Sequence, residues 1–329
     1  MSVTVASVQD ALPPHAAMEQ AAQWFALLSS GVATPADQAS WRGWLEGHQD
    51  HRRAWSYVES VSRRFAPMQE QPDPRTAAAV LQRARTQHRP RRRALALLAG
   101  VGVLGLVAWR VPAVRDTALA MTADYCSPTG ATRLVRLADG TQVWLNSASA
   151  LDVDYRAGLR RLTLVAGEIL VDTAKDDRPL VVDTPQGRLR ALGTRFTVRQ
   201  ETDATLLAVY QGAVEALTGS GEALQVVDAG RQLRFTHDRI GNSASADPAR
   251  EAWTRGILLA RDIALADVIR ELGRHRRGHL SLDPAVADLR VYGGFPLHDT
   301  DQTLALLADV LPIRIRHPLP WWTSIDARP

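Results

Sequence analysis

The strongest match to a chemical motif in this sequence is a glycine pattern of the kind found in dinucleotide-binding loops. Gly100, Gly102 and Gly105 fit G-x-G-x-x-G, and Asp124 follows at about the 20-residue distance of an acidic ribose ligand. The motif needs a buried strand before it and a helix after it. Instead, "RPRRR" precedes it, and Pro112 would interrupt the helix. We therefore expect no nucleotide site here.

Other side chains that could do chemistry are scattered. The sequence contains no H-E-x-x-H, G-x-S-x-G or P-loop motif. The paired carboxylates Asp176-Asp177, and Asp152 with Asp154, fall in turn-like and alternating strand contexts, where solvated surface is the expected role. A single cysteine, Cys126, excludes an internal disulfide. We predict that the protein is not an enzyme and has no metal site and no cofactor.

An uncharged apolar segment, residues 94–109, follows a run of arginines. Seven arginines lie in residues 75–93, and the next acidic residue is Asp116. Such a charge run fits a nucleic-acid surface, a solvated tail or the cytoplasmic flank of a membrane helix, and the adjoining apolar segment favours the third. No face of the segment is polar, and its length of about 24 Å as a helix approaches the ~30 Å of a bilayer core. We therefore predict one transmembrane helix over 94–113.

The N-terminal part, residues 1–66, is predicted to be a small all-α module of three short helices. Thr34, Pro35 and Asp37 have the types and spacing of a capped helix start. The module is rich in large aromatic side chains: Trp24, Phe25, Trp41, Trp44 and Trp55. They could fill a small core, or they could anchor a protein partner, since Trp is enriched in binding hot spots. Residues 67–93 are predicted to be a basic linker.

The pattern changes to short alternating strands after this. Apolar residues alternate on both sides of Asp139-Gly140, which predicts a hairpin. Further strands with recurring glycines predict an all-β domain over 114–236, either a sandwich or solenoid-like. After a polar linker, 237–252, the order β-α-β-β-α-β predicts a compact α+β module over 253–329. The predicted fold class is therefore multidomain, with all-α, transmembrane, all-β and α+β parts.

Three blocks of the sequence together resemble FecR-type regulators. The segments "AAQWFALLSSG" and "ADQASWRGWLEGHQDHRRAW" look like the cytoplasmic anti-sigma module of that family. The segments "VRLADGTQVWLNSASALDVDY", "VAGEILVDT" and "VYQGAVEA" resemble its periplasmic β domain. The last predicted module is similar to the small N-terminal fold of secretins and TonB receptors. The three blocks follow one another in the family's order.

The resemblance implies a regulator in the bacterial inner membrane that crosses it once, with a cytoplasmic N-terminus and periplasmic C-terminal domains. The helices would bind an extracytoplasmic-function (ECF) sigma factor, with the five aromatic residues named above as candidate contacts. The periplasmic part would receive a signal from the N-terminal signalling domain of a TonB-dependent outer-membrane receptor for iron–siderophore uptake. Periplasmic and intramembrane proteases would then release the cytoplasmic module, and no direct contact with nucleic acid is expected. The alternative is a membrane-anchored scaffold or enzyme of the envelope without a sigma partner.

Two sites follow from the resemblance. Gly193-Thr194, in "ALGTRFTV", matches the family's Gly-Thr bond, at which some members cleave themselves. The Thr194 hydroxyl would attack the Gly193 carbonyl and form an ester that water cleaves. The alternative is that the glycine only allows a bulge between two strands. Arg274, Arg276 and Arg277 form a candidate receptor-binding patch, although they would equally suit a solvated helix end.

Overall fold

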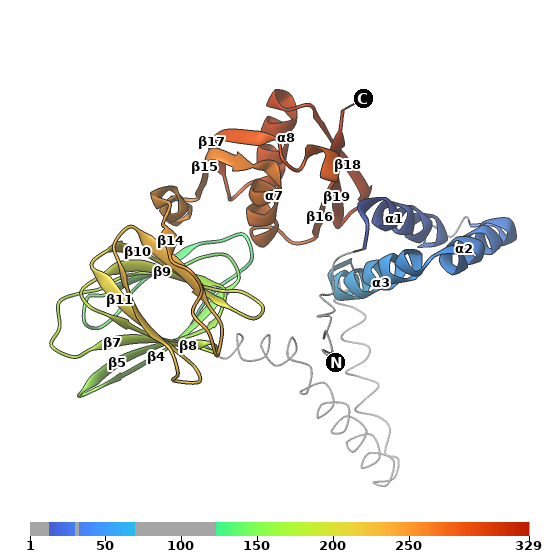
Figure 1. Ribbon diagram of the computed structural model, residues 1–329. Helices are drawn as coiled ribbons and strands as arrows, with labels where there is room; N and C mark the ends of the chain where they lie inside the picture. The colour runs from blue at the N-terminus through green and yellow to red at the C-terminus, as the bar shows by residue number, and fades with distance from the viewer. Residues whose placement is uncertain (1–12, 30–32, 70–122, 329) are drawn as a thin grey trace, which may run out of the picture. The chain divides into compact units, whose positions relative to one another are not determined.

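The structure, a computed structural model, describes residues 13–29, 33–69 and 123–328 (Figure 1). The contacts between residues divide the chain into two units. Unit 1 comprises Met1–Arg89, Gly278–Leu289 and Leu304–Pro329, and unit 2 comprises Pro90–Arg277 and Arg290–Thr303. Each unit has its own cluster of buried apolar side chains.

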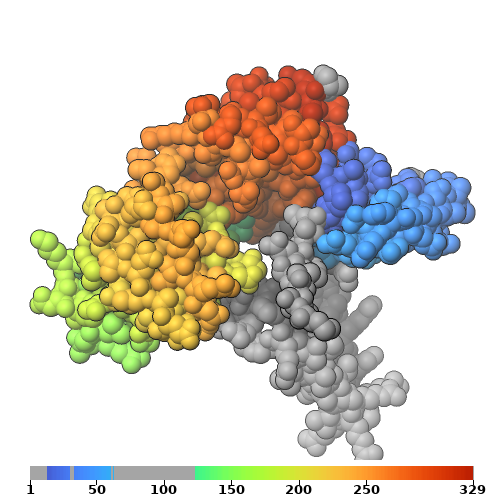
Figure 2. Space-filling view, in the orientation of Figure 1, coloured from blue at the N-terminus to red at the C-terminus, as the bar shows by residue number. Residues whose placement is uncertain are grey.

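Unit 1 begins with three helices. They are α1 (His15–Ser29), α2 (Pro35–Gly47) and α3 (Gln49–Gln69). The Thr34 hydroxyl accepts from the Asp37 N–H and the Asp37 carboxylate accepts from the Thr34 N–H, so the predicted helix start is confirmed. Ala21 in α1 packs near Ala54 and Val58 in α3, and all three are fully buried. Helix α2 has no buried residue, and the blue residues of these helices lie at the surface in Figure 2.

The rest of unit 1 contains a three-stranded sheet. Its elements are β16 (His279–Leu282), η2 (Pro284–Val286), β18 (Ile313–Leu319) and β19 (Trp322–Ala327). Strand β19 lies in the middle, parallel to β16 and antiparallel to β18. Trp321 and Trp322 are buried in the same apolar cluster as Met18 of α1. The Arg316 guanidinium forms ion pairs with Glu19 at 2.5 Å and with Asp326 at 2.6 Å.

Unit 2 contains two seven-stranded sheets that enclose one apolar core. The first sheet has the order β1 (Tyr125–Ser127), β4 (Ser149–Arg156), β5 (Leu159–Ala166), β7 (Leu180–Thr184), β8 (Gly187–Ala191), β11 (Ala213–Thr218) and β12 (Leu224–Asp228). The second has the order β14 (Ala244–Ser245), β13 (Arg231–Phe235), β10 (Thr205–Gln211), β9 (Arg195–Gln200), β6 (Glu168–Asp172), β3 (Gln142–Leu145) and β2 (Arg133–Arg136).

Apolar residues alternate with more polar ones along these strands, so that one face of each strand is buried in the core. In β5, Leu162 and Leu164 are fully buried, whereas Thr163 between them is only partly buried. Phe196 of β9 and Phe235 of β13 fill the core from the other sheet. Each such side chain stabilises the fold by about 1.5–3 kcal/mol relative to exposure. The core therefore holds the loops between strands in fixed positions.

Unit 2 also contains elements after the two sheets. They are η1 (Pro248–Arg255), β15 (Ile257–Ala264), α7 (Leu265–Arg274), β17 (Arg290–Pro296) and the first residues of α8 (Thr300–Val310). Strands β15 and β17 pair with each other in a two-stranded antiparallel sheet. Leu265, Val268, Ile269 and Leu272 are buried on one face of α7, as their spacing predicts.

The predicted fold class is wrong in its layout. In the described residues, no helix is both long and apolar enough to span a bilayer, and the predicted transmembrane helix, 94–113, lies outside those residues. The elements of the predicted α+β module, 253–329, occur in the expected order but do not form one module. Their strands divide between two sheets, because β19 adds an unexpected strand that pairs β16 with β18. That three-stranded sheet belongs to the same unit as the N-terminal helices.

Candidate functional site

Gly193 and Thr194 form the turn between β8 and β9. Gly193 is exposed and has a φ of 74°, in the left-handed region that favours glycine. Thr194 is 4% exposed, and its buried hydroxyl has no hydrogen-bond partner among the described residues. The turn thus places a free hydroxyl directly after a glycine carbonyl.

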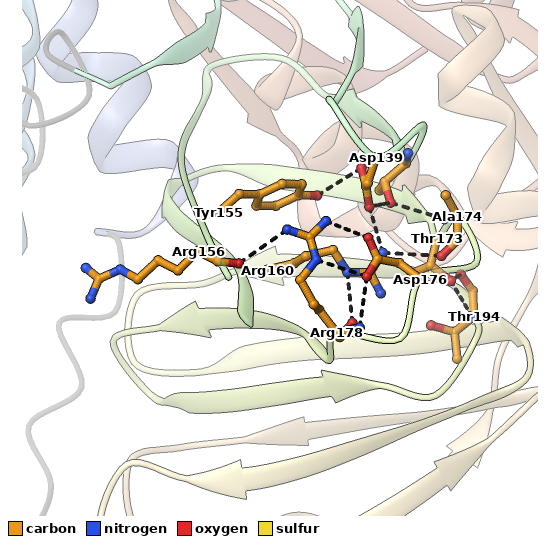
Figure 3. Close-up of polar contacts among 10 residues, drawn as sticks. Asp139, Tyr155, Arg156, Arg160, Thr173, Ala174, Asp176, Arg178 and Thr194 are labelled. Carbon is orange, nitrogen blue, oxygen red and sulfur yellow. Dashed lines mark hydrogen bonds and ion pairs between the residues drawn. The ribbon is translucent and has the colours of Figure 1, made fainter. Parts of the chain in front are cut away.

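Thr173 holds the backbone of Thr194 in place (Figure 3). The Thr194 N–H donates to the Thr173 Oγ1 at 2.7 Å. The Thr194 carbonyl accepts from the Thr173 hydroxyl at 3.1 Å and from the Thr173 N–H at 3.0 Å. The nitrogen of the Gly193–Thr194 bond is therefore in hydrogen-bond contact with another hydroxyl.

Gly212, between β10 and β11, lets the Gly193–Thr194 turn pack closely against the connection of these two strands. It has a φ of 74°. A Cβ on Gly212 would lie 2.3 Å from the Gly193 oxygen and 2.8 Å from the Thr194 Cγ2. Any larger residue at position 212 would therefore displace the Gly193–Thr194 bond.

A cavity of about 390 Å³ lies beside this turn, lined by Thr173, Gly193 and several charged side chains. Arg160 is one of the lining residues, and it forms a buried ion pair with Asp139, with 2.6 Å between Nη1 and Oδ2. Arg160 also donates to the carbonyls of Arg178 at 3.0 Å and Ala174 at 3.3 Å. Because Arg160 joins three segments of the chain, it fixes the loop that carries Thr173.

The carboxylates of Asp139 and Asp176, which lie near Arg160 and Arg178, are stabilised in their ionised forms. Burial raises the pKa of Asp139, but hydrogen bonds from Thr141 and Arg160 lower it more, so its net pKa is below the usual value. The hydrogen bond from the Arg178 guanidinium holds the pKa of Asp176 well below its usual range. Burial, together with the Asp139 charge, raises the pKa of Tyr155, whose hydroxyl donates to Asp139 at 3.2 Å (Figure 3). These groups already satisfy one another, so they act as a scaffold.

The arrangement has the parts of a single acyl shift. In such a shift the Thr194 hydroxyl would be the nucleophile and the Gly193 carbonyl the electrophile, and Thr173 contacts the nitrogen that would leave. No carboxylate or imidazole of the described residues forms a hydrogen bond to the Thr194 hydroxyl. A reaction at this bond would therefore lack a positioned general base and would be slow, as suits a single turnover.

The five aromatic residues predicted to bind a sigma factor are all half-buried. Trp55 joins two of them, with ring centroids 4.9 Å from Trp41 and 6.0 Å from Phe25. Trp44 stacks on His51 and donates from Nε1 to Gln20 at 2.6 Å. The Trp41 Nε1 is buried and has no hydrogen-bond partner among the described residues. The structure thus brings together Phe25, Trp41 and Trp55, while Trp24 and Trp44 lie elsewhere on the helices.

The arginines of the predicted receptor-binding patch do not form one surface. Arg274 lies in a buried ion cluster, 2.7 Å from Glu168 and 3.1 Å from Glu271. Arg276 pairs with Asp301 at 2.8 Å, and Arg277 is exposed. The charge of Arg274 is therefore paired with two carboxylates inside unit 2.

The ion cluster around Arg274 was not predicted from the sequence. Glu271 also pairs with Arg199 at 3.1 Å. Burial raises the pKa of Glu271, but Arg274 and Arg199 lower it more, so the carboxylate stays ionised. Glu168 and Arg274 are 106 residues apart, and no local pattern links them.

Among the described residues, His15, Glu19 and Asp326 come close enough to suggest a metal site. The Arg316 guanidinium lies between the two carboxylates and pairs with both. His15 Nε2 is 3.2 Å from Asp326, and its Nδ1 is 2.7 Å from the Ser281 hydroxyl. An arginine in this position already supplies the positive charge, so the group is an ion-pair network of unit 1.

Comparison with known proteins identifies two segments of the chain. Residues 123–215, which span the strands from β1 into β11, match the family model described as FecR protein. Residues 19–61 match a family described as a domain of unknown function, DUF4880. No match was found among curated proteins.

Two solved structures share the fold. Both are crystal structures, at 1.65 and 2.50 Å, described as a candidate anti-sigma factor from Parabacteroides distasonis ATCC 8503. Each is 24% identical to this chain, covers 62% of it and has a TM-score of 0.51. The alignments cover 98% and 97% of those chains.

These matches define a protein with a FecR domain. The match covers β1 into β11 of the two sheets that carry the Gly193–Thr194 turn, and we call these two sheets the FecR domain. The DUF4880 match, over residues 19–61, covers most of α1–α3. The resemblance to FecR-type regulators is therefore confirmed.

Proposed function

We propose that this protein regulates a sigma factor by binding it through helices α1–α3. The observation that carries the proposal is the FecR match over residues 123–215, preceded by the DUF4880 match over 19–61. The fold shared with structures described as a candidate anti-sigma factor supports it.

The aromatic residues of α1–α3 suit such an interface. The group formed by Phe25, Trp41 and Trp55 combines large apolar area with an unpaired Trp41 Nε1 donor. Buried Trp side chains are frequent hot spots, and a donor without a partner is costly until an acceptor reaches it. A sigma-factor helix that offers an apolar face and one carbonyl or carboxylate would meet both requirements.

The finer proposal follows the FecR-type pattern. The sigma factor would be of the ECF class, and the FecR domain would relay a signal from the N-terminal signalling domain of a TonB-dependent receptor, with iron–siderophore uptake as the inducing process. Periplasmic and intramembrane proteases would end the inhibition. The matched families and structures do not name the ECF sigma factor, the receptor or the proteases, so each of these partners is a separate proposal.

We also propose that the protein works at the bacterial inner membrane, with α1–α3 on the cytoplasmic side and the FecR domain on the periplasmic side. In unit 1, α1 contacts β18 and β19. Helices on the cytoplasmic side could not keep these contacts with periplasmic strands, so the contacts and the proposed location cannot both occur at the same time. Cys126 allows a direct test, because it is the only cysteine and is exposed at β1. A membrane-impermeant maleimide should label Cys126 in spheroplasts, and labelling only after lysis would contradict the periplasmic location.

Gly193–Thr194 is proposed as a self-cleavage site. The Thr194 Oγ1 would attack the Gly193 carbonyl carbon, the C–N bond would break, and the hydroxyl proton would pass to the Thr194 nitrogen. Thr173 would stabilise the departing nitrogen and hold the bond in place, since its hydroxyl oxygen accepts from this N–H and its hydroxyl donates to the Thr194 carbonyl. Water would then hydrolyse this ester to the Gly193 carboxylate and the Thr194 hydroxyl, and the second fragment would begin at Thr194 with the amine that the shift set free. Apart from this single turnover, no enzymatic activity is proposed.

Co-purification tests the regulatory function. The full chain is expressed with each ECF sigma factor of its host in turn, and one of them should be retained in a stoichiometric complex. A Trp41→Ala variant should weaken that complex, while the matched Trp144→Ala variant in β3 of the FecR domain should not. Retention of no sigma factor would contradict the proposal.

A further inference from the structure

Strand β15 has one unpaired edge. It pairs with β17 on one side and with no other strand among the described residues. The Leu297 N–H donates to the Gly256 carbonyl at 2.9 Å, just before β15 begins. Hydrogen bonding alternates along an antiparallel pair, so the N–H and C=O groups of Ile257 and Leu259 point away from β17. Pro296, opposite Ile257, has no N–H to offer it.

A cavity of about 210 Å³ lies against β15, and Leu297, just after β17, also lines it. Ile257, Leu258 and Leu259 all line it. Successive side chains of a strand point to opposite faces, so a cavity that touches three in a row lies beside the edge of the strand. Trp253 of η1 and Asp267 of α7 form parts of its wall. Free backbone groups and an apolar recess therefore lie side by side.

The cavity is the right size for one side chain. Sites that enclose whole small ligands are typically about 300–1,000 Å³, larger than this recess. Six charged residues line the cavity. Glu168, Arg199 and Glu271 are paired within the Arg274 cluster. Asp267 pairs with Arg270, and Asp247 accepts a hydrogen bond from the Ala249 N–H. Arg250 acts electrostatically on Glu271, so the cavity does not call for a charged ligand. Ile257, Leu258, Leu259 and Ile263 of β15 supply apolar side chains to the rest of the lining.

Two polar atoms in the lining residues need partners. The Trp253 Nε1 donor and the Gln232 Oε1 acceptor are buried, and neither has a hydrogen-bond partner among the described residues. Trp253 itself is only 5% exposed. A peptide amide offers one acceptor and one donor, so a backbone segment matches this pair of requirements.

We propose that the open edge of β15 is a docking site for an extended strand of a partner protein. The strand would add to β15 through the outward backbone groups of Ile257 and Leu259 and would place one aliphatic or aromatic side chain in the 210 Å³ cavity. Main-chain hydrogen bonds would supply affinity, and the cavity would select the side chain. This inference goes beyond the sigma-factor proposal, because it uses no residue of α1–α3.

The test uses a displayed library of random peptides, selected on the immobilised full chain, with affinities measured by fluorescence anisotropy. The selected peptides should carry an apolar residue within an extended, alternating pattern. Leu259→Pro removes an outward N–H without touching the β17 pairing and should weaken binding about tenfold or more. Ala249→Leu, which fills the cavity, should weaken it similarly.

The matched control is Val226→Pro on β12, the edge strand of the first sheet. The Ala229 N–H donates to the Gly212 carbonyl, so by the same alternation the Val226 N–H points to solvent. Peptides should bind this variant as they bind the unaltered chain. N-methylation of the peptide tests the same hydrogen bonds without altering the protein, and it should weaken binding at alternate positions. A selection without binders, equal binding to the Leu259→Pro and Val226→Pro variants, or no effect of N-methylation would overturn the proposal.

Discussion

The Arg160–Asp139 ion pair is expected to be a large single contributor to the stability of the Gly193–Thr194 site. The side chains of Arg160 and Asp139 are 5% and 1% exposed, and 2.6 Å separates their charged atoms. Arg160→Met would leave a buried carboxylate without its counterion and would leave the Ala174 and Arg178 carbonyls without a donor. Breaking such a buried pair from one side typically costs about 3–5 kcal/mol.

Hydrogen exchange is the suitable assay, because a chain of several domains does not unfold in a single two-state step. Amides of β5 and β7 that exchange through opening of the FecR domain should exchange faster by roughly two to three orders of magnitude in Arg160→Met, since 1.4 kcal/mol corresponds to about tenfold. The double variant Asp139→Asn, Arg160→Met should recover part of this loss, because it leaves no buried charge.

Arg188→Met is the matched control. Arg188 pairs with Asp183 at 2.6 Å, but its side chain is 47% exposed. Exposed pairs contribute about 0–1 kcal/mol, so exchange should change less than about tenfold. If Arg160→Met accelerated exchange no more than Arg188→Met, the argument that Arg160 holds the Thr173 loop would be wrong.

Three further predictions concern the FecR domain and its surroundings. Self-cleavage gives one fragment that ends at Gly193 and another that begins at Thr194, and mass spectrometry can detect both. Thr194→Ala should abolish these fragments, and Thr173→Val should slow their formation. Fragments of unchanged amount in Thr194→Ala would refute self-cleavage. Gly212→Ala should lower the melting temperature and the yield of fragments together, because its Cβ would lie 2.3 Å from the Gly193 oxygen. Burial lowers the pKa of His275 to about 4, so the native imidazole stays neutral while the unfolded one protonates below about 6.5. The free energy of the opening that exposes His275, measured by hydrogen exchange of the α7 amides, should therefore fall by ~3 kcal/mol between pH 7 and pH 4. A non-titrating His275→Gln variant should lack most of this decrease.

Local signals in the sequence were sufficient for most individual elements. The Thr34–Asp37 capping box and the apolar face of α7 depend on residues a few positions apart, and both occur as predicted. Strand β19 was missed, because Trp321 and Trp322 gave no alternating pattern. β19 pairs with β16 and β18, which are distant from each other in the sequence. Because of this pairing, β16 and β18 form a separate sheet from β15 and β17, and the predicted α+β module does not occur.

At the Gly193–Thr194 site, too, local motifs were found from the sequence and long-range contacts were missed. The Gly193–Thr194 dipeptide was found through its resemblance to a family motif, and the structure places it in a turn with a free hydroxyl. Thr173 was not found, because its contact with Thr194 crosses 21 residues and a change of strand. Arg274 was read as surface charge because a helix end is usually solvated, whereas Glu168 and Glu271 pair with it inside unit 2. Tertiary ion pairs of this kind leave no periodic trace in a sequence.

The most direct test of the account is the affinity of the purified chain for the sigma factor with which it co-purifies. Isothermal titration should give a one-to-one complex, and Trp41→Ala should weaken it by about 2 kcal/mol, or roughly 30-fold, with Trp144→Ala unchanged. Equal affinity of the Trp41→Ala variant and the unaltered chain, or the absence of any measurable complex, would contradict the claim that helices α1–α3 bind a sigma factor.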